Sequence, residues 1–324
     1  MKIGKLSNSL LESIIIEPIN KNSVDRKEVL LKPSIGEDCA ALDLGENICL
    51  LSTDPITGAI EDIGKLAINI NANDIASSGG EPIGIMVTAL LPQSITEKEI
   101  AKIIEDLYSE ARKIDIAILG GHTEITDAVN KPILSCTVIG KTKKLISSGG
   151  AKAGDSVIMT KYAGLEGTAI FASDKAYLLK NVDKRILEKA KTFGENLSVI
   201  KEGEVAVKAG ANAMHDVTEG GILGACWEIA NCSGLGIEIE VEKIPILKET
   251  RVICDELKVN PLKLISSGSM LIACRDYKKM LCELEKAGIF ATKIGIMTES
   301  GRYVIEKGKK YILSEPDVDE LYKV

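Results

Sequence analysis

The stretch DIGKLAININANDIASSGGEPIG, residues 62–84, constrains the fold more than any other part of this 324-residue chain. One helix face is marked by apolar residues that recur at the i, i+3, i+4 and i+7 spacing: Ile63, Leu66, Ala67 and Ile70. At about 100° per residue, Asp74 falls roughly 20° from Ile63 and inside the same stripe. The pattern predicts a packed helix that directs a carboxylate toward the protein interior.

Two interpretations of this helix remain open from the sequence. Asp74 either belongs to a functional site, or pairs with Lys65 or caps a neighbouring loop near the end of the helix. The opposite face carries the polar residues Asp62, Lys65, Asn69 and Asn73. That face is either solvated, as in most amphipathic helices, or it is a ligand-binding or subunit surface.

Composition and charge narrow the class of protein. With 45% hydrophobic and 27% charged residues, the chain is expected to be globular and long enough for two domains. A net charge of −7 and only 3% aromatic residues argue against a nucleic-acid-binding protein. The opening MKIGKLSNSLLESIII has no long apolar signal core, and no later run is long enough to span a membrane, so we expect a cytoplasmic protein.

The eight cysteines contain no CxxC pair, and most lie in apolar segments. Reduced, buried cysteine is therefore favoured over disulfides or a metal site. The only histidines are His122 and His215, which makes a histidine-rich zinc site a poor match.

Strand and helix signals alternate through the first half, which predicts an α+β fold with a split β-α-β pattern. Expected strands are NICLLSTDPI, GIMVTALL, DIAILGG and PILSCTVIG. The helix expected over residues 96–114 begins with a capping box, Thr96 followed by Glu99. Composition shifts to Ser, Gly and Lys at residues 143–155, so we predict domains over residues 1–147 and 148–324.

Further carboxylates stand in loops or at strand ends. GEDCA places Asp38 in a loop, Asp54 follows a strand in LLSTDPITG, and LGGHTE places His122 and Glu124 at another strand end. If these positions gather with Asp74, the like charges repel, and a divalent cation such as Mg²⁺ would offset the repulsion. The alternative for Asp38 and Asp54 is a turn residue that bonds its own backbone.

Two glycine loops are candidates for holding an anion. KYAGLEGTA follows an expected strand and opens a helix, so its free backbone N–H groups and the helix dipole favour phosphate. HDVTEGGILGACWEIA repeats the arrangement, with Asp216 or Thr218 as the expected cap. The alternative is that the glycines serve close packing only.

These motifs together resemble a known superfamily. GEDCA, residues 53–83, GGHTE and HDVTEGGILGACWEIA occur in the order and spacing of aminoimidazole ribonucleotide (AIR) synthetase and its relatives. Those relatives include the hydrogenase maturation protein HypE, thiamine-monophosphate kinase and selenophosphate synthetase. The resemblance covers nearly the whole chain, and it is greatest to HypE and HypE-like proteins.

The resemblance implies a PurM-like fold: an N-terminal α/β domain, whose sheet joins that of a second copy in a barrel, and a C-terminal α+β domain. It also implies bound ATP and Mg²⁺. By motif match, Mg²⁺ would be held by Asp38, Asp54 and Asp74. The nucleotide or substrate would lie beside Lys65, Asn73, Gly121, Thr123, Gly164 and Gly167. Catalytic roles would fall to Asp74, His122 and Asp216.

The implied chemistry is transfer of the ATP γ-phosphoryl group to an oxygen of a small-molecule or protein-borne acceptor, with a hydrogenase maturation protein as an expected partner. Two departures matter. No cysteine follows Cys282, whereas HypE ends in a carrier cysteine. His122 stands where HypE and the thiamine kinase have an aspartate, so either Glu124 replaces that carboxylate, the metal has one ligand fewer, or His122 is a turn residue bonded to the backbone.

Two other functions are compatible with the same motifs. One is the purine-pathway phosphoribosylformylglycinamidine cyclo-ligase, which GGHTE matches less well. The other is a nucleotide-binding assembly or regulatory module that has the fold without turnover.

Overall fold

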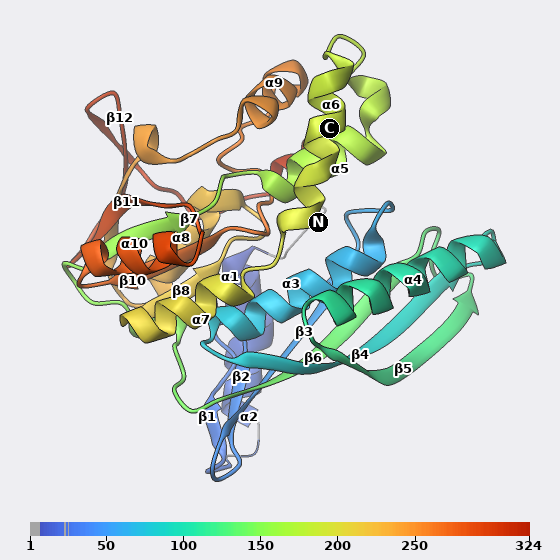
Figure 1. Cartoon of the computed structure of the whole chain (residues 1–324). Helices are drawn as coiled ribbons and strands as arrows, with labels where there is room; N and C mark the ends of the chain where they lie inside the picture. The colour runs from blue at the N-terminus through green and yellow to red at the C-terminus, as the bar shows by residue number, and fades with distance from the viewer. Residues whose placement is uncertain (1–6, 23, 25) are drawn as a thin grey trace.

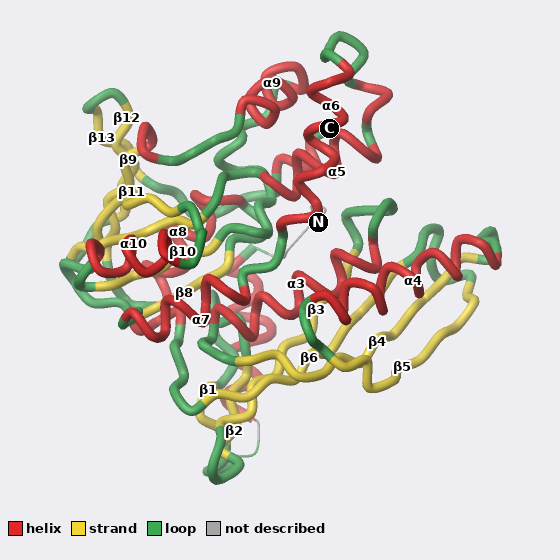
Figure 2. The backbone as a smooth tube through the Cα atoms, viewed as in Figure 1, coloured by secondary structure: helices red, strands yellow, loops and turns green. Residues whose placement is uncertain are grey.

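The computed structural model describes residues 7–22, 24 and 26–324 (Figure 1). The first six residues of the opening stretch, in which the sequence predicts no signal core, lie outside the described residues. Two mixed β-sheets with packed helices form the N-terminal and C-terminal parts of the molecule (Figure 2). This is the two-domain α+β arrangement that the sequence predicts.

The N-terminal sheet has the strand order β1-β2-β3-β6-β4-β5. Its strands are β1 (Val29–Leu31), β2 (Ala40–Asp43), β3 (Ile48–Ile56), β4 (Glu81–Pro92), β5 (Ala117–Thr126) and β6 (Ile133–Thr142). Antiparallel β6 lies between β3 and β4, which are joined through α3 (Ile63–Ser77). This confirms the split β-α-β pattern.

Helix α4 (Glu97–Lys113) lies beside α3 on the N-terminal sheet (Figure 1) and connects the parallel strands β4 and β5. Its predicted capping box is present: the N–H of Glu99 donates to Oγ1 of Thr96, and the N–H of Thr96 donates to Oε2 of Glu99. Two reciprocal bonds satisfy N–H groups that would otherwise lack partners at the helix start. Before the sheet, α1 (Asn8–Leu10) and α2 (Glu17–Asn22) are joined by a π-helical segment, Leu11–Ile16.

The C-terminal sheet has the order β13-β12-β9-β11-β7-β10-β8. Its strands are β7 (Ser156–Thr160), β8 (Ala213–Asp216), β9 (Gly236–Glu240), β10 (Met270–Cys274), β11 (Ala291–Thr298), β12 (Arg302–Glu306) and β13 (Lys309–Ile312). Its helices are α5 (Leu165–Asp174), α6 (Lys184–Lys191), α7 (Ile200–Ala209), α8 (Gly221–Cys232), α9 (Lys248–Leu257) and α10 (Tyr277–Lys286). Strand β10 pairs antiparallel with β7 on one side and with β8 on the other, and every residue of the three strands is buried.

Helix α3 lies between the two sheets. It contacts β3 and β6 on one side and α7 on the other. Gly203 of α7 permits this approach, because a side-chain carbon there would collide with the carbonyl of Ala76. Asn73 is buried against the second domain, and Asn69 is buried against α4, where it bonds Glu110. The solvated interpretation of their face is therefore wrong for both residues.

Within the part of the chain that the structure describes, no helix is both long and apolar enough to cross a membrane.

Candidate active site

Asp74 lies inside the molecule, as the apolar stripe predicts. Its exposed fraction is 5%, and Oγ of Ser52 on β3 donates a hydrogen bond of 2.5 Å to its Oδ2. Lys65 is not its partner: the ammonium lies 2.7 Å from Asp62 at the start of the helix. Asp74 follows Lys65 by nine positions, which is roughly 13 Å along the helix axis. The alternative of a Lys65–Asp74 pair is therefore wrong.

Asp38 is held against the C-terminal end of α3. Its Oδ2 accepts hydrogen bonds from the hydroxyls of Ser77 (2.8 Å) and Ser148 (3.2 Å). Ser77 follows Asp74 by less than one turn, while Ser148 belongs to the connection between the domains. Asp38 is thus placed by both domains and not by its own turn.

Asp54 lies within β3, so the predicted position after the end of the strand is wrong. Its backbone N–H donates to Oδ1 of Asn71 on α3 (3.1 Å). Asp216 ends β8 and is buried. Burial raises the pKa of Asp74 well above its usual value, and the nearby charges of Asp216, Asp54 and Asp38 raise it further. The fold therefore brings these four carboxylates close enough for their charges to interact, and the other three make ionisation of Asp74 harder.

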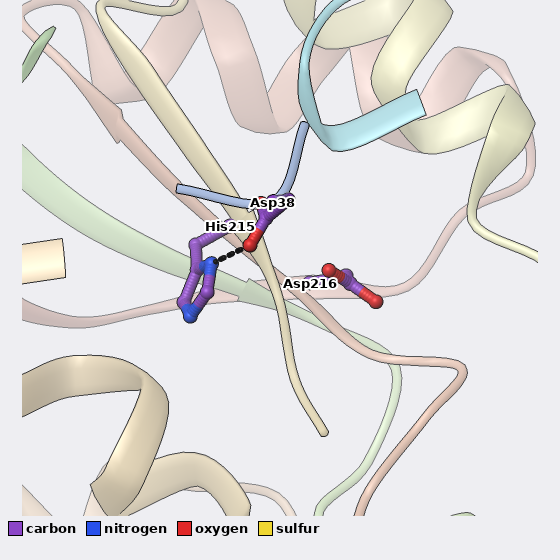
Figure 3. A group of neighbouring side chains, drawn as sticks. All are labelled: Asp38, His215 and Asp216. Atoms are coloured by element: carbon purple, nitrogen blue, oxygen red, sulfur yellow. Dashed lines mark ion pairs between the residues drawn. The ribbon is translucent and has the colours of Figure 1, made fainter. Parts of the chain in front are cut away.

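Two of these carboxylates and a neighbouring histidine have the arrangement of cation ligands. A side-chain donor atom from each of Asp38, His215 and Asp216 lies within 4.8 Å of the other two (Figure 3). Carboxylate oxygens are the ligands that Mg²⁺ prefers, so the acidic members suit that ion. Of the predicted ligands Asp38, Asp54 and Asp74, only Asp38 belongs to this group. The two carboxylates of the group fit the expected cation, whose binding stays a prediction.

The buried His215 is a residue that the sequence did not single out. Its Nδ1 lies 2.7 Å from Oδ1 of Asp38, and its Nε2 lies 3.1 Å from Oε2 of Glu228 on α8. Burial by itself lowers the pKa of the ring, but the charges and hydrogen bonds of Asp38 and Glu228 outweigh it and raise the pKa well above the usual value. The signal in the sequence is the position of His215 directly before Asp216 at a strand end.

Asn73 joins the domains through its amide. Nδ2 donates to the carbonyl of Leu197, and Oδ1 accepts the N–H of Val199, each at 2.8 Å. Lys161, directly after β7, holds the same segment: its ammonium donates to the carbonyl of Ser198 at 2.6 Å and pairs with Glu202 at 2.8 Å. Both polar groups of the Asn73 side chain are therefore engaged by the C-terminal domain.

Gly121, His122 and Thr123 lie on β5, away from the carboxylates of the same chain. In the sheet register, His122 on β5 lies level with Pro55 on β3, and the strands β4 and β6 lie between them. Three strand spacings of about 4.8 Å put roughly 14 Å between them. The His122 side chain is 66% exposed and its Nε2 lies 3.2 Å from Oε2 of Glu124. Both His122 and Glu124 lie within β5 and not at its end, so the predicted strand-end position is wrong. Because His122 lies in a strand and contacts a carboxylate, the turn-histidine interpretation is wrong as well.

Gly164 and Gly167 pack against a buried serine loop, Ser266–Ser269. The N–H of Gly164 donates to Oγ of Ser266 (2.8 Å), and that of Gly167 donates to the carbonyl of Ile265 (3.0 Å). Gly164 has φ +73°, and a side chain at Gly167 would collide with Leu264. These two N–H groups have protein acceptors, which agrees with the close-packing alternative.

The serine loop also reaches the strand that carries Asp216. The carbonyl of Ser269 accepts the N–H of Val217 (3.0 Å), and Oγ of Ser269 donates to the carbonyl of Tyr162 (2.7 Å). The loop thus connects the start of α5 to the carboxylate cluster. Its signal in the sequence is the small-residue run SSGS before an apolar strand.

Comparison with known proteins identifies the family. Residues 36–142 match the N-terminal domain, and residues 152–308 the C-terminal domain, of AIR synthase related proteins. A hydrogenase expression/formation protein of Methanocaldococcus jannaschii is 27% identical over 290 residues, covering 86% of this chain and 82% of that protein. Carbamoyl dehydratase HypE of Cupriavidus necator is 24% identical over 258 residues, covering 77% of this chain and 72% of that protein.

A solved structure of ThiL complexed with AMPPCP and TMP has the same fold, with a TM-score of 0.76 at 22% identity and 96% of each chain covered. The two family matches together span more than half of the sequence. The chain belongs to the AIR synthase related protein family.

Proposed function

We propose that this protein is a HypE-like, ATP-dependent enzyme that transfers the γ-phosphoryl group of ATP to an amide-type or other acceptor oxygen. Its relatives include ATP-dependent enzymes of the same superfamily. The observation that carries the proposal is the gathering of Asp38, Asp54, Asp74 and Asp216. Burial raises the pKa of Asp74, and the charges of the other three carboxylates raise it further. A site that concentrates negative charge in this way suits a divalent cation and the phosphates it binds.

Asp38, Asp54 and Asp74 would hold Mg²⁺, with Asp216 and His215 beside them. The bound ion would neutralise charge on the transferred phosphoryl group. Ser52 and Ser77 orient Asp74 and Asp38 through their hydroxyl donors. Preset ligands need little reorganisation when charge develops during the reaction.

His215 is suited to holding a proton at Nδ1 or Nε2, because carboxylates flank both nitrogens. That proton compensates part of the negative charge around Asp38. Cation binding at Asp38 would weaken the hold on the proton, so metal affinity is expected to rise with pH.

A second candidate function is a kinase that phosphorylates a substrate hydroxyl or phosphate. The fold shared with the ThiL chain solved with AMPPCP and TMP favours it. The relative from Methanocaldococcus jannaschii favours a role in hydrogenase maturation, with a protein-borne acceptor. A module that binds nucleotide without turnover is the third candidate, and turnover separates it from the other two.

The test is calorimetric titration with Mg²⁺ and ATP, together with measurement of ADP release. We expect Mg²⁺-dependent binding to the wild type and at least a tenfold loss in Asp74→Asn, with Asp127→Asn in an exposed loop as the control. Unchanged affinity in Asp74→Asn would reject the site. Release of ADP supports an enzyme, whereas tight binding without release in the presence of candidate acceptors supports the nucleotide-binding module.

We also propose a homodimer formed through β5. The strand is an edge of the N-terminal sheet and is exposed along nearly its whole length. Exposed apolar side chains lie on it and on the neighbouring β4: Ile83, Met86, Ile118, Leu119 and Ile125. Unprotected edges with apolar side chains favour pairing with another strand. Light scattering should report a dimer for the wild type and a shift to monomer for Leu119→Lys.

A further inference from the structure

Strand β3 loses its neighbour on one side before it reaches Asp54. Strand β2 pairs with β3 from Ile48 to Leu51, whereas β6 pairs with it on the other side as far as Ile56. Among the described residues, no strand pairs with β3 beyond Leu51 on the β2 side. Backbone groups of the later residues that point to that side therefore need hydrogen-bond partners from another element.

Asn71 of α3 supplies these partners at Asp54. Oδ1 of Asn71 accepts the N–H of Asp54 at 3.1 Å, and Nδ2 donates a longer hydrogen bond of 3.5 Å to the carbonyl of Asp54. Nδ2 also donates to the carbonyl of Ala67, one turn earlier on the helix, at 2.9 Å. Asn71 is 0% exposed, so water does not compete for these bonds. The amide therefore joins both backbone groups of Asp54 to α3.

The position of the Asp54 backbone determines where its carboxylate lies. Side chains two positions apart in a strand point to the same face. Ser52 on this face of β3 donates to Oδ2 of Asp74 at 2.5 Å. Asp54 therefore faces the same way, and its charge acts on Asp74. A shift of the backbone at Asp54 would move its carboxylate relative to the others of the cluster.

We propose that Asn71 is a positioning residue of the carboxylate site, whose amide holds the Asp54 backbone so that the Asp54 carboxylate can bind the divalent cation. The inference rests on the proposed function for the presence of that cation. Both polar atoms of Asn71 are engaged by backbone groups, so it acts through Asp54 and not as a ligand. Removing a group that orients a metal ligand typically lowers metal affinity by about 10–100-fold.

Asn69 provides a matched control on the same helix. It is also buried, and its Nδ2 donates to the carbonyl of Lys65, four positions earlier, at 3.0 Å. The same Nδ2 donates to Oε1 of Glu110 on α4, which is not one of the clustered carboxylates. Replacing Asn69 by alanine therefore removes a comparable buried amide without removing a contact to Asp54.

The probe is Mn²⁺ alone, which suits the same oxygen ligands as Mg²⁺. It is titrated into the full chain without nucleotide, and the free ion is followed by electron paramagnetic resonance. We expect Asn71→Ala to bind Mn²⁺ at least tenfold more weakly than the wild type, and Asn69→Ala to bind it like the wild type. Should Asn71→Ala not fold, Asn71→Ser leaves a smaller cavity and carries the same comparison.

Asp54→Asn sets the limit of the effect, because it removes the charge of the ligand itself. If Asn71 acts through Asp54, the loss of Mn²⁺ affinity in Asn71→Ala cannot exceed the loss in Asp54→Asn. A larger loss in Asn71→Ala would overturn the inference, and so would equal Mn²⁺ affinities of Asn71→Ala and Asn69→Ala.

Two outcomes separate this inference from the proposed function. Absence of Mn²⁺ binding to the folded wild type would overturn both, because the site would then hold no cation. Binding of Mn²⁺ without binding of AMPPCP, an ATP analogue, would reject the proposed function and leave the positioning role of Asn71 standing.

Discussion

Nδ1 of His215 lies 2.7 Å from Oδ1 of Asp38, in a buried ion pair between a strand of the C-terminal domain and a loop of the N-terminal domain. The pair links the two domains at the same place where the carboxylates gather. Its position makes the protonation of one histidine relevant to both domain packing and cation binding.

Replacing His215 by glutamine should lower stability most at acidic to neutral pH. The folded-state pKa of His215 is raised, so its contribution is fully present below the unfolded value near 6.5 and is lost as pH rises through the folded value. Breaking a buried pair typically costs about 3–5 kcal/mol. Thermal unfolding at pH 6 and at pH 9 measures the change.

The control for that experiment is His122→Gln, because the His122–Glu124 pair is exposed. Exposed ion pairs contribute about 0–1 kcal/mol to the free energy of unfolding, so little change in stability is expected. A loss in His215→Gln that is no larger than in His122→Gln would contradict the buried-pair explanation.

Replacing Asn73 by alanine should destabilise the protein by about 2–4 kcal/mol, because it leaves a buried carbonyl and a buried N–H without partners. Asn69→Ala is the comparison: that buried side chain bonds Glu110 of α4, within the N-terminal domain. Hydrogen exchange of the Val199 amide, whose N–H donates to Asn73, should accelerate in Asn73→Ala only. Equal acceleration in both variants would show that the effect is not specific to the domain contact.

Gly121→Ala should disrupt the pairing of β4 and β5, since a side-chain carbon there would overlap the carbonyl of Val87. Gly120→Ala offers a close control, because Gly120 also has positive φ but has nothing within 4 Å of that position. Overpacking typically costs about 1–3 kcal/mol. Urea unfolding should show that Gly121→Ala is destabilised by this amount more than Gly120→Ala. Equal unfolding midpoints of the two variants would refute the steric explanation.

Glu166→Gln should gain stability relative to the wild type as pH rises. The wild-type carboxyl has its pKa raised from 4.5 to about 7, so the folded state keeps a proton that the unfolded state releases. Stability therefore falls across that window, by about 3 kcal/mol at 1.36 kcal/mol per pKa unit. Urea unfolding at pH 5 and pH 8 measures it, with Glu249→Gln expected to follow the wild type.

Local signals in the sequence were sufficient for much of the fold. The capping box of Thr96 and Glu99 is present because it depends on residues three apart. The split β-α-β unit follows from strand and helix periodicities within one continuous segment. The inward direction of Asp74 likewise follows from its place on the apolar stripe of α3.

The sequence could not reveal partners that lie far along the chain. Asn73 is joined to Leu197 and Val199 only because α7 and α3 pack together. The buried Glu166 accepts the N–H of Ser267, which lies 101 residues further along the chain and leaves no periodic signal near residue 166.

Sequence by itself determined β3, β4, β5, β6, α3 and α4 of the N-terminal domain, the inward carboxylate of α3 and the family motifs, because these depend on short-range periodicity and spacing. It did not indicate the short elements β1, β2, α1 and α2. Only the tertiary structure decided that His215 pairs with Asp38, that Asn73 joins the domains and that His122 lies far from the carboxylates of its own chain. The physical reason is that burial and charge pairing are set by contacts between segments separated by many residues, which packing creates and local pattern does not encode.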